Sequence, residues 1–178
     1  KYSSSYLIMK LFRLFLPFIL GLNLLFSCKE IDCPLDNIVV MTIGLYDSET
    51  LQSLTLEDTL TVKASGTDSI LLNRALGVNS IQLPIRQGSK MDTLMFCFSN
   101  KEYQIAIDTI FLGHTNEPHF ESIDCPPSVF HTITHVSWTS HPLSKLPLTI
   151  DSVAVARTKV NYDDVENLKV YLRSTVSQ

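Results

Sequence analysis

The fold is decided by a stretch near the end of the chain, Glu166-Asn167-Leu168-Lys169-Val170-Tyr171-Leu172-Arg173. Leu168, Val170 and Leu172 fall on one face of this stretch, and the residues between them fall on the other. A period of two residues is typical of a half-buried antiparallel strand. Because a single strand is not stable in water, the stretch predicts a sheet with one buried face.

Similar short segments recur towards the N-terminus, with turn residues between them. We expect these further strands at 37–46, 59–64, 69–72, 80–85, 92–98, 102–112, 128–138 and 149–157. Gly113 and Pro118 predict a loop at 113–118, because both residue types interrupt strands. Pro84 has no backbone N–H, so the strand at 80–85 is predicted to lie at an edge or to contain a bulge. Outside the N-terminal region no segment keeps an apolar stripe of helical period. The chain therefore predicts an all-β fold, an antiparallel β-sandwich of immunoglobulin-like type forming one domain over residues 37–174.

The N-terminal region has the layout of a secretory signal peptide. Lys10 and Arg13 precede an apolar run, and the small residue Ser27 stands before Cys28. This order is typical of export signals. The ending 25–28 resembles the lipobox of bacterial lipoproteins, where a diacylglycerol is attached to the cysteine and the preceding residues are removed. An uncleaved membrane anchor is an alternative, but a span needs about 20 apolar residues and this run is shorter and contains a proline.

We accordingly expect a helical signal peptide at 1–27, in which residues 1–8 are a spurious extension. We expect a tether at 28–36 that is lipidated at Cys28, with palmitate among the acyl chains. Removal of 1–27 takes away three basic residues and no acidic residue, and the formal charge falls from −4 to −7. An acidic chain excludes nucleic acid as an expected partner. Membrane attachment is therefore expected through the lipid.

Three cysteines remain besides the lipidated one. Cys97 lies in an apolar run, where a free cysteine behaves as a small hydrophobic residue. Cys33 and Cys125 each lie between an aspartate and a proline, in segments that read as loops. Three pairings are possible in an oxidising compartment. We favour a disulfide between Cys33 and Cys125, and three reduced thiols remain the alternative.

The sequence contains no recognisable catalytic or metal site. The histidines are His114, His119, His131, His135 and His141. On one strand His131 and His135 would have Cα atoms ~13 Å apart, too far to share one zinc ion. There is no nucleophile elbow and no phosphate-binding glycine loop. The acidic group at 163–166 is expected to be a solvated turn rather than a calcium site. Trp138 is expected in the core rather than in a sugar-binding platform. We expect no enzyme activity, no metal and no cofactor.

An aspartate followed by a hydroxyl residue and an aliphatic residue occurs five times. An aspartate in a turn commonly opens a strand, which is one interpretation. The triplet also resembles the O-glycosylation acceptor of Bacteroides-type bacteria. The candidate acceptors are Thr59, Ser69, Thr93, Thr109 and Ser152.

From residue 108 onward the chain resembles a family of uncharacterised Bacteroidetes lipoproteins that share a domain of unknown function. The resemblance rests on 116–125, on 129–131, on 150–153 with Val160, and on 166–172. It implies a lipoprotein and supports the pairing of Cys33 with Cys125. It implies no activity, substrate or catalytic residue.

Together these features predict an outer-membrane lipoprotein, facing the periplasm or the cell surface, without enzymatic activity. We expect a protein interaction or envelope-assembly module with an envelope protein as partner. The alternative is a surface lipoprotein that binds a glycan or a small ligand.

Overall fold

The computed structural model describes residues 33, 38–67, 69–101, 105–141 and 148–174. The chain divides into two compact units, Lys1–Cys33 and Pro34–Gln178. The described part of the second unit contains ten strands and no helix. The predicted signal peptide, the predicted lipidation site at Cys28 and most of the tether lie outside the described residues.

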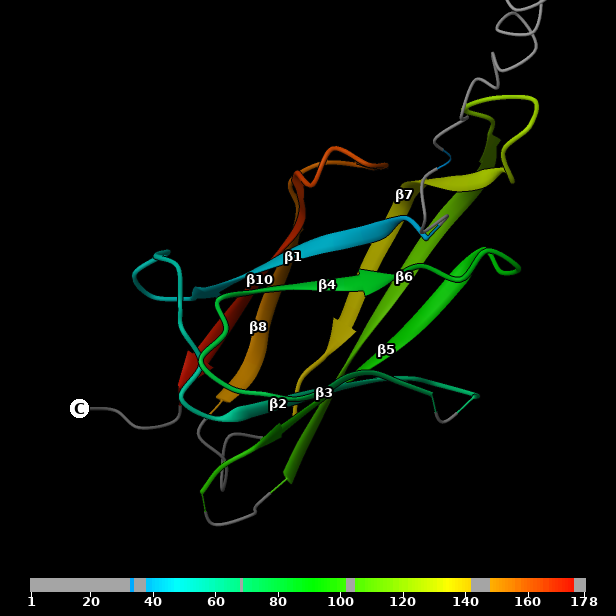
Figure 1. The fold of residues 1–178 in the computed structure, drawn as a ribbon. Coiled ribbons are helices and arrows are strands. Elements are labelled where there is room, and N and C mark those ends of the chain that lie inside the picture. The colour runs from blue at the N-terminus through cyan, green and yellow to red at the C-terminus, as the bar shows by residue number, and fades with distance from the viewer. Residues whose placement is uncertain (1–32, 34–37, 68, 102–104, 142–147, 175–178) are drawn as a thin grey trace, which may run out of the picture. The chain divides into compact units, whose positions relative to one another are not determined.

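One sheet has four strands in the order β4-β1-β10-β8. Their bounds are β1 Val40–Asp47, β4 Ser80–Pro84, β8 Leu148–Val155 and β10 Glu166–Ser174. β4 pairs antiparallel with β1, and β10 pairs antiparallel with β8. β1 and β10 are parallel neighbours, with Leu45 opposite Val170. The first and last strands of the domain therefore lie side by side at the centre of this sheet (Figure 1).

The second sheet has six strands in the order β3-β2-β5-β6-β7-β9, and every pairing in it is antiparallel. Its strands are β2 Thr59–Ala64, β3 Ser69–Ala75, β5 Met91–Ser99, β6 Ile105–His119, β7 Ser128–Thr139 and β9 Lys159–Val160. β6 and β7 are the longest strands and form one extended hairpin (Figure 1).

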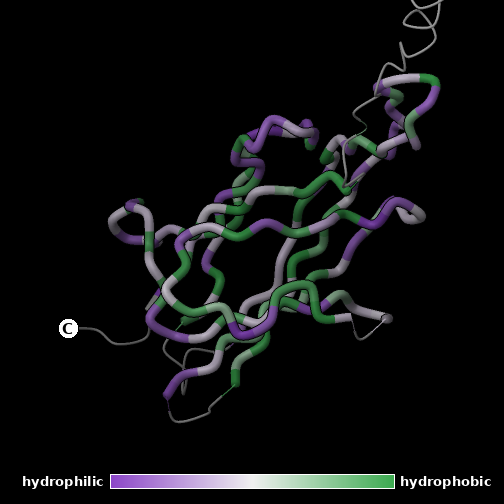
Figure 2. Tube along the Cα trace, in the orientation of Figure 1, coloured by the Kyte–Doolittle hydropathy of each residue, from purple (hydrophilic) through white to green (hydrophobic). Residues whose placement is uncertain are grey.

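The two sheets face each other across one hydrophobic core. Buried and more exposed residues alternate along β2 and β4. Figure 2 shows hydrophobic and hydrophilic positions interspersed along the strands. The buried positions include Ile43 of β1, Leu168 of β10, Leu60 of β2, Phe96 of β5 and Ile110 of β6. Each of these side chains is essentially inaccessible to solvent. The predicted β-sandwich is confirmed, although the pair β1–β10 makes the four-stranded sheet mixed rather than purely antiparallel.

The prediction of a loop at 113–118 is wrong, because β6 continues to His119. β5 begins at Met91, which lies opposite Gly113, so among the described strands β6 pairs beyond this point only with β7. A proline is tolerated on such an edge, and Pro118 lies opposite Val129. The short strand β9 was not predicted. The edge position expected from Pro84 is confirmed, since β4 pairs only with β1 among the described strands.

The three cysteines that the structure describes behave as the sequence predicts. Cys33 and Cys125 are disulfide-bonded. Cys97 is free and almost completely buried. Burial raises the pKa of the Cys97 thiol, and the nearby Lys63 ammonium opposes this only in part. A buried thiol of raised pKa is unreactive.

Candidate ligand cleft and its polar support

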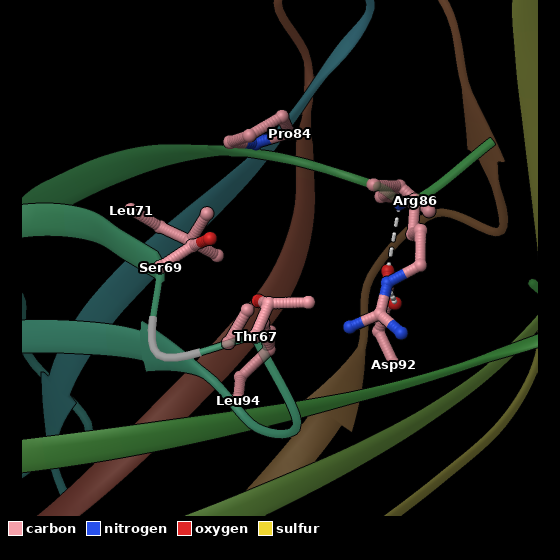
Figure 3. A pocket seen from close by; sticks show the side chains of 9 residues that line it. Thr67, Ser69, Leu71, Pro84, Arg86, Asp92 and Leu94 are labelled. Atoms are coloured by element: carbon pink, nitrogen blue, oxygen red, sulfur yellow. Dashed lines mark hydrogen bonds and ion pairs between the residues drawn. The ribbon is translucent and has the colours of Figure 1, made fainter. Parts of the chain in front are cut away.

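An open cleft lies between the edge strands β3 and β4 of the two sheets. It has a volume of about 330 Å³. Ser69 and Leu71 of β3 line one side, and Pro84 at the end of β4 lines the other (Figure 3). Ala64, Thr67, Ile85, Arg86, Asp92 and Leu94 complete the wall. β3 pairs only with β2 among the described strands, as β4 pairs only with β1, so the cleft runs between two open sheet edges.

Arg86 and Asp92 form the charged end of this cleft. The Arg86 Nε lies 3.4 Å from the Asp92 Oδ1, and the backbone N–H of Arg86 donates to the Asp92 Oδ2 at 2.9 Å (Figure 3). Arg86 also donates through Nη2 to the carbonyl of Ser65 at 3.3 Å. Its side chain is 42% exposed, whereas that of Asp92 is 5% exposed. The guanidinium therefore remains accessible from the cleft while its carboxylate partner is fixed inside.

Behind Asp92 lies a buried group of polar side chains that was not predicted. The Asn116 Oδ1 lies 2.8 Å from the Nδ1 of His114 and 2.8 Å from the Nδ1 of His131. The Asn116 Nδ2 donates to the carbonyls of Gln87 and Ser89, at 2.7 and 2.6 Å. This amide orientation makes Oδ1 an acceptor, so both histidines carry a proton on Nδ1. The His114 Nε2 lies 3.6 Å from the Asp92 Oδ2.

His131 is the histidine whose titration is most altered by this environment. The pKa of His131 is lowered to about 4, mainly by burial and to a smaller extent by the nearby His114, while Asp92 opposes the shift. Its ring meets that of His114 edge-on, with the centroids 5.4 Å apart. His131 is therefore neutral at physiological pH, and the cluster acts as a hydrogen-bonded support for the loop at 85–90.

A second buried carboxylate, Asp108, connects the two sheets. It lies on β6 and is completely buried. Its Oδ2 accepts from the backbone N–H of Ile150 at 2.7 Å and from the Thr149 hydroxyl at 3.1 Å, both on β8. Its Oδ1 accepts from the backbone N–H of His141 at 2.6 Å and lies 2.8 Å from the His141 Nδ1. Asp108 thus satisfies four donors and joins β6 to β8 of the opposite sheet.

The side chains that line the cleft are suited to binding a ligand. Leu71, Ile85 and Leu94 offer apolar contacts, and Arg86 offers a cation. The two histidines behind Asp92 do not line the cleft. Among the described residues no group of three or more metal-binding side chains could hold a metal ion.

The other predicted positions are dispersed over the domain. His131 is buried, whereas His135 is exposed. Asp163 accepts from the Arg157 guanidinium at 2.6 Å, and Asp164 accepts from Gln82 at 3.2 Å. Trp138 packs against the core, as predicted.

The five predicted glycosylation acceptors differ in exposure. Ser69 is exposed. The remaining four are half-buried, namely Thr59, Thr93, Thr109 and Ser152. The aspartates that precede Thr93 and Thr109 are the buried Asp92 and Asp108, which form the two polar networks. A glycan therefore fits best at Ser69, and glycosylation stays a prediction.

The described part of the chain contains no helix that is long and apolar enough to span a membrane. In the comparison with protein families, the model of a family of unknown function (DUF6452) matches residues 59–172, from the start of β2 into β10. Neither the curated proteins nor the solved structures include a match to the chain. The Bacteroidetes origin and the lipoprotein signal stay predictions.

Proposed function

The chain belongs to the DUF6452 family, whose function is unknown, and we therefore propose its role from its geometry. In this proposal the protein is a non-enzymatic outer-membrane lipoprotein that binds an extended segment of another envelope protein. The observation that carries this proposal is the cleft between β3 and β4. Among the described strands, each of the two has one edge that pairs with no other strand, and an incoming strand can pair there. The apolar side chains of the cleft would receive alternate side chains of that segment, since side chains along a strand alternate.

Several features favour binding over catalysis. The cleft is lined mainly by apolar side chains and by hydroxyls, with one ion pair at its end. The Asp92 carboxylate is engaged by Arg86, and His131 is fixed by Asn116. These contacts hold the polar groups in place rather than direct them towards a reacting atom.

The membrane attachment in this proposal rests on the lipobox-like sequence ending at Cys28. Mass spectrometry of the protein from its native host tests it, and an N-terminal Cys28 carrying diacylglycerol is the expected result. The variant Cys28→Ser is expected to move from the membrane to the soluble fraction. An unmodified Cys28 in the mature protein would contradict the anchor and leave the binding proposal standing.

Photo-cross-linking in intact cells tests the binding proposal. A photoreactive amino acid replaces Thr67, an exposed residue that lines the cleft. The matched control places it at Ala154, an exposed residue of β8, the opposite edge of the four-stranded sheet. We expect a protein adduct from position 67 and none from position 154. Equal adducts, or none from either position, would contradict a partner at this cleft.

A small ligand is the second candidate. The volume of about 330 Å³ lies within the range of small-molecule sites. The exposed guanidinium of Arg86 favours an anionic compound. A glycan is less favoured, because none of the described residues that line the cleft is aromatic. If the ligand is a small molecule, the photoreactive residue at position 67 would give no protein adduct. Cell extract depleted of protein would stabilise the purified domain, and Arg86→Ala would abolish this stabilisation.

A further inference from the structure

We propose that the loop at 120–127, between β6 and β7, faces the lipid bilayer and inserts Phe120 and Ile123 into its interface. The inference deepens the proposed function, and it rests on the lipid anchor at Cys28.

The loop presents apolar side chains where a water-exposed turn would normally be polar. Phe120 is 65% exposed and Ile123 is 97% exposed. The backbone N–H of Cys125 donates to the carbonyl of Ser122 at 3.2 Å, and that of Asp124 donates to the Ser122 hydroxyl at 3.4 Å. This turn holds Ile123 at its tip, away from the rest of the domain.

The base of the loop is packed. The rings of His119 and Phe130 stack with centroids 4.1 Å apart, and Phe130 meets Tyr162 edge-on at 5.3 Å. Phe120 follows directly after this stack. The apolar tip is therefore presented from an ordered base, which reduces the entropic cost of inserting it.

The covalent link from the lipidated Cys28 through Cys33 to Cys125 is short, which places the membrane at this end of the domain. Cys33 is the fifth residue after Cys28, and an extended chain of five residue steps spans at most about 18 Å. A disulfide adds about 6 Å between Cα atoms, which brings Cys125 within about 24 Å of the lipidated residue. β6 has 15 residues and is about 50 Å long, so the anchor cannot reach the end that begins at Ile105.

The charged side chains in the loop and next to it indicate which lipids it meets. Glu117, Glu121 and Asp124 are exposed, and His119 lies 3.2 Å from the Glu121 carboxylate. Carboxylates are repelled by an anionic surface. The loop therefore fits a bilayer with zwitterionic headgroups, with the apolar tip supplying the attraction.

Fluorescence quenching in vesicles tests the inference. The lipidated full-length protein is reconstituted into phosphatidylcholine vesicles that contain lipids brominated near the top of the acyl chains, because interfacial side chains lie about 5–10 Å deep. Ile123→Trp is compared with Ile105→Trp, a control on the same strand pair that is 64% exposed at the opposite end. The wild type, whose single tryptophan is Trp138, provides the background.

We expect bromine to quench the tryptophan introduced at position 123 and to leave that at position 105 unchanged. Replacing part of the phosphatidylcholine with phosphatidylglycerol is expected to reduce the quenching. Equal emission with and without bromine at position 123, in protein that carries its lipid and sediments with the vesicles, would overturn the inference and leave the anchor intact. Protein without the lipid, which stays in solution, would instead contradict the anchor. Unchanged circular dichroism shows that each variant is folded.

Discussion

At the scale of single residues, His131 makes the free energy of unfolding depend on pH. Its pKa is about 4 in the folded chain and about 6.5 when solvated, so between these values the unfolded chain binds more protons. The contribution to the free energy of unfolding is complete above pH 6.5 and falls as the pH drops to 4. The loss amounts to roughly 3 kcal/mol at most.

Urea denaturation at several pH values measures this effect. We expect His131→Gln to flatten the dependence of stability on pH between 4 and 6.5. His135→Gln, on an exposed residue, is expected to leave that dependence unchanged. A slope that is the same in wild type and in His131→Gln would show that another group titrates in this range.

Asp108 is the other residue whose loss should be severe. Asp108→Ala removes an acceptor shared by four donors of His141, Thr149 and Ile150, and leaves buried donors unsatisfied. We expect a loss of about 3–5 kcal/mol in the free energy of unfolding, measured by urea denaturation. Asp151→Asn serves as the control. Its carboxylate pairs at the surface with Arg173 at 3.4 Å, and its loss should cost less than about 1 kcal/mol.

At the scale of the strands, Gly44 allows β1 to pack beside β10. A Cβ there would lie 1.9 Å from the Glu166 Oε2 and 2.7 Å from the Tyr46 ring. The Tyr46 hydroxyl donates to that same carboxylate oxygen at 2.9 Å, which raises the pKa of Tyr46, with smaller contributions from burial and from the Glu166 charge.

Gly44→Ala is therefore expected to cost about 1–3 kcal/mol of unfolding free energy and to bring the pKa of Tyr46 back towards its ordinary value. Urea denaturation and ultraviolet titration of the tyrosines measure the two effects. Gly88→Ala is the matched control, because no atom lies within 4 Å of the Cβ that would be added. An unchanged tyrosine titration in Gly44→Ala would show that the hydrogen bond to Glu166 survives.

The strands themselves were largely predictable, and the site was not. Alternation located β10 and β2, because one buried face leaves a period of two in the sequence. The extension of β6 was missed because glycine and proline usually mark the end of a strand. Gly113 and Pro118 are tolerated here because no described strand pairs with β6 on its β5 side beyond Gly113. The register shift of β6 against β7 between Gly113 and His114 brings His114 towards His131. No local pattern encodes this register, so the cluster behind Asp92 could not be predicted.

For the whole molecule, the disulfide should supply a large part of the stability. Cys33 and Cys125 are far apart in sequence, so the bond restricts a long loop of the unfolded chain. We expect Cys125→Ser to lower the free energy of unfolding by about 2–5 kcal/mol. Cys97→Ala, which removes the free thiol, should cost about 1 kcal/mol or less. Equal losses in the two variants, measured by urea denaturation, would contradict this assignment.

The parallel pair of β1 and β10 has a consequence for how the chain folds. The backbone N–H of Thr42 donates to the Asn167 side chain at 3.1 Å, across 125 residues of sequence. β1 and β10 are the first and last of the described strands, so their pairing closes a long loop of the chain. The core-facing side chains of β1 are therefore not covered by β10 until that distant segment has been brought back beside them. Such distant pairing slows folding, and a chain that stops before residue 166 leaves the centre of the four-stranded sheet unfilled.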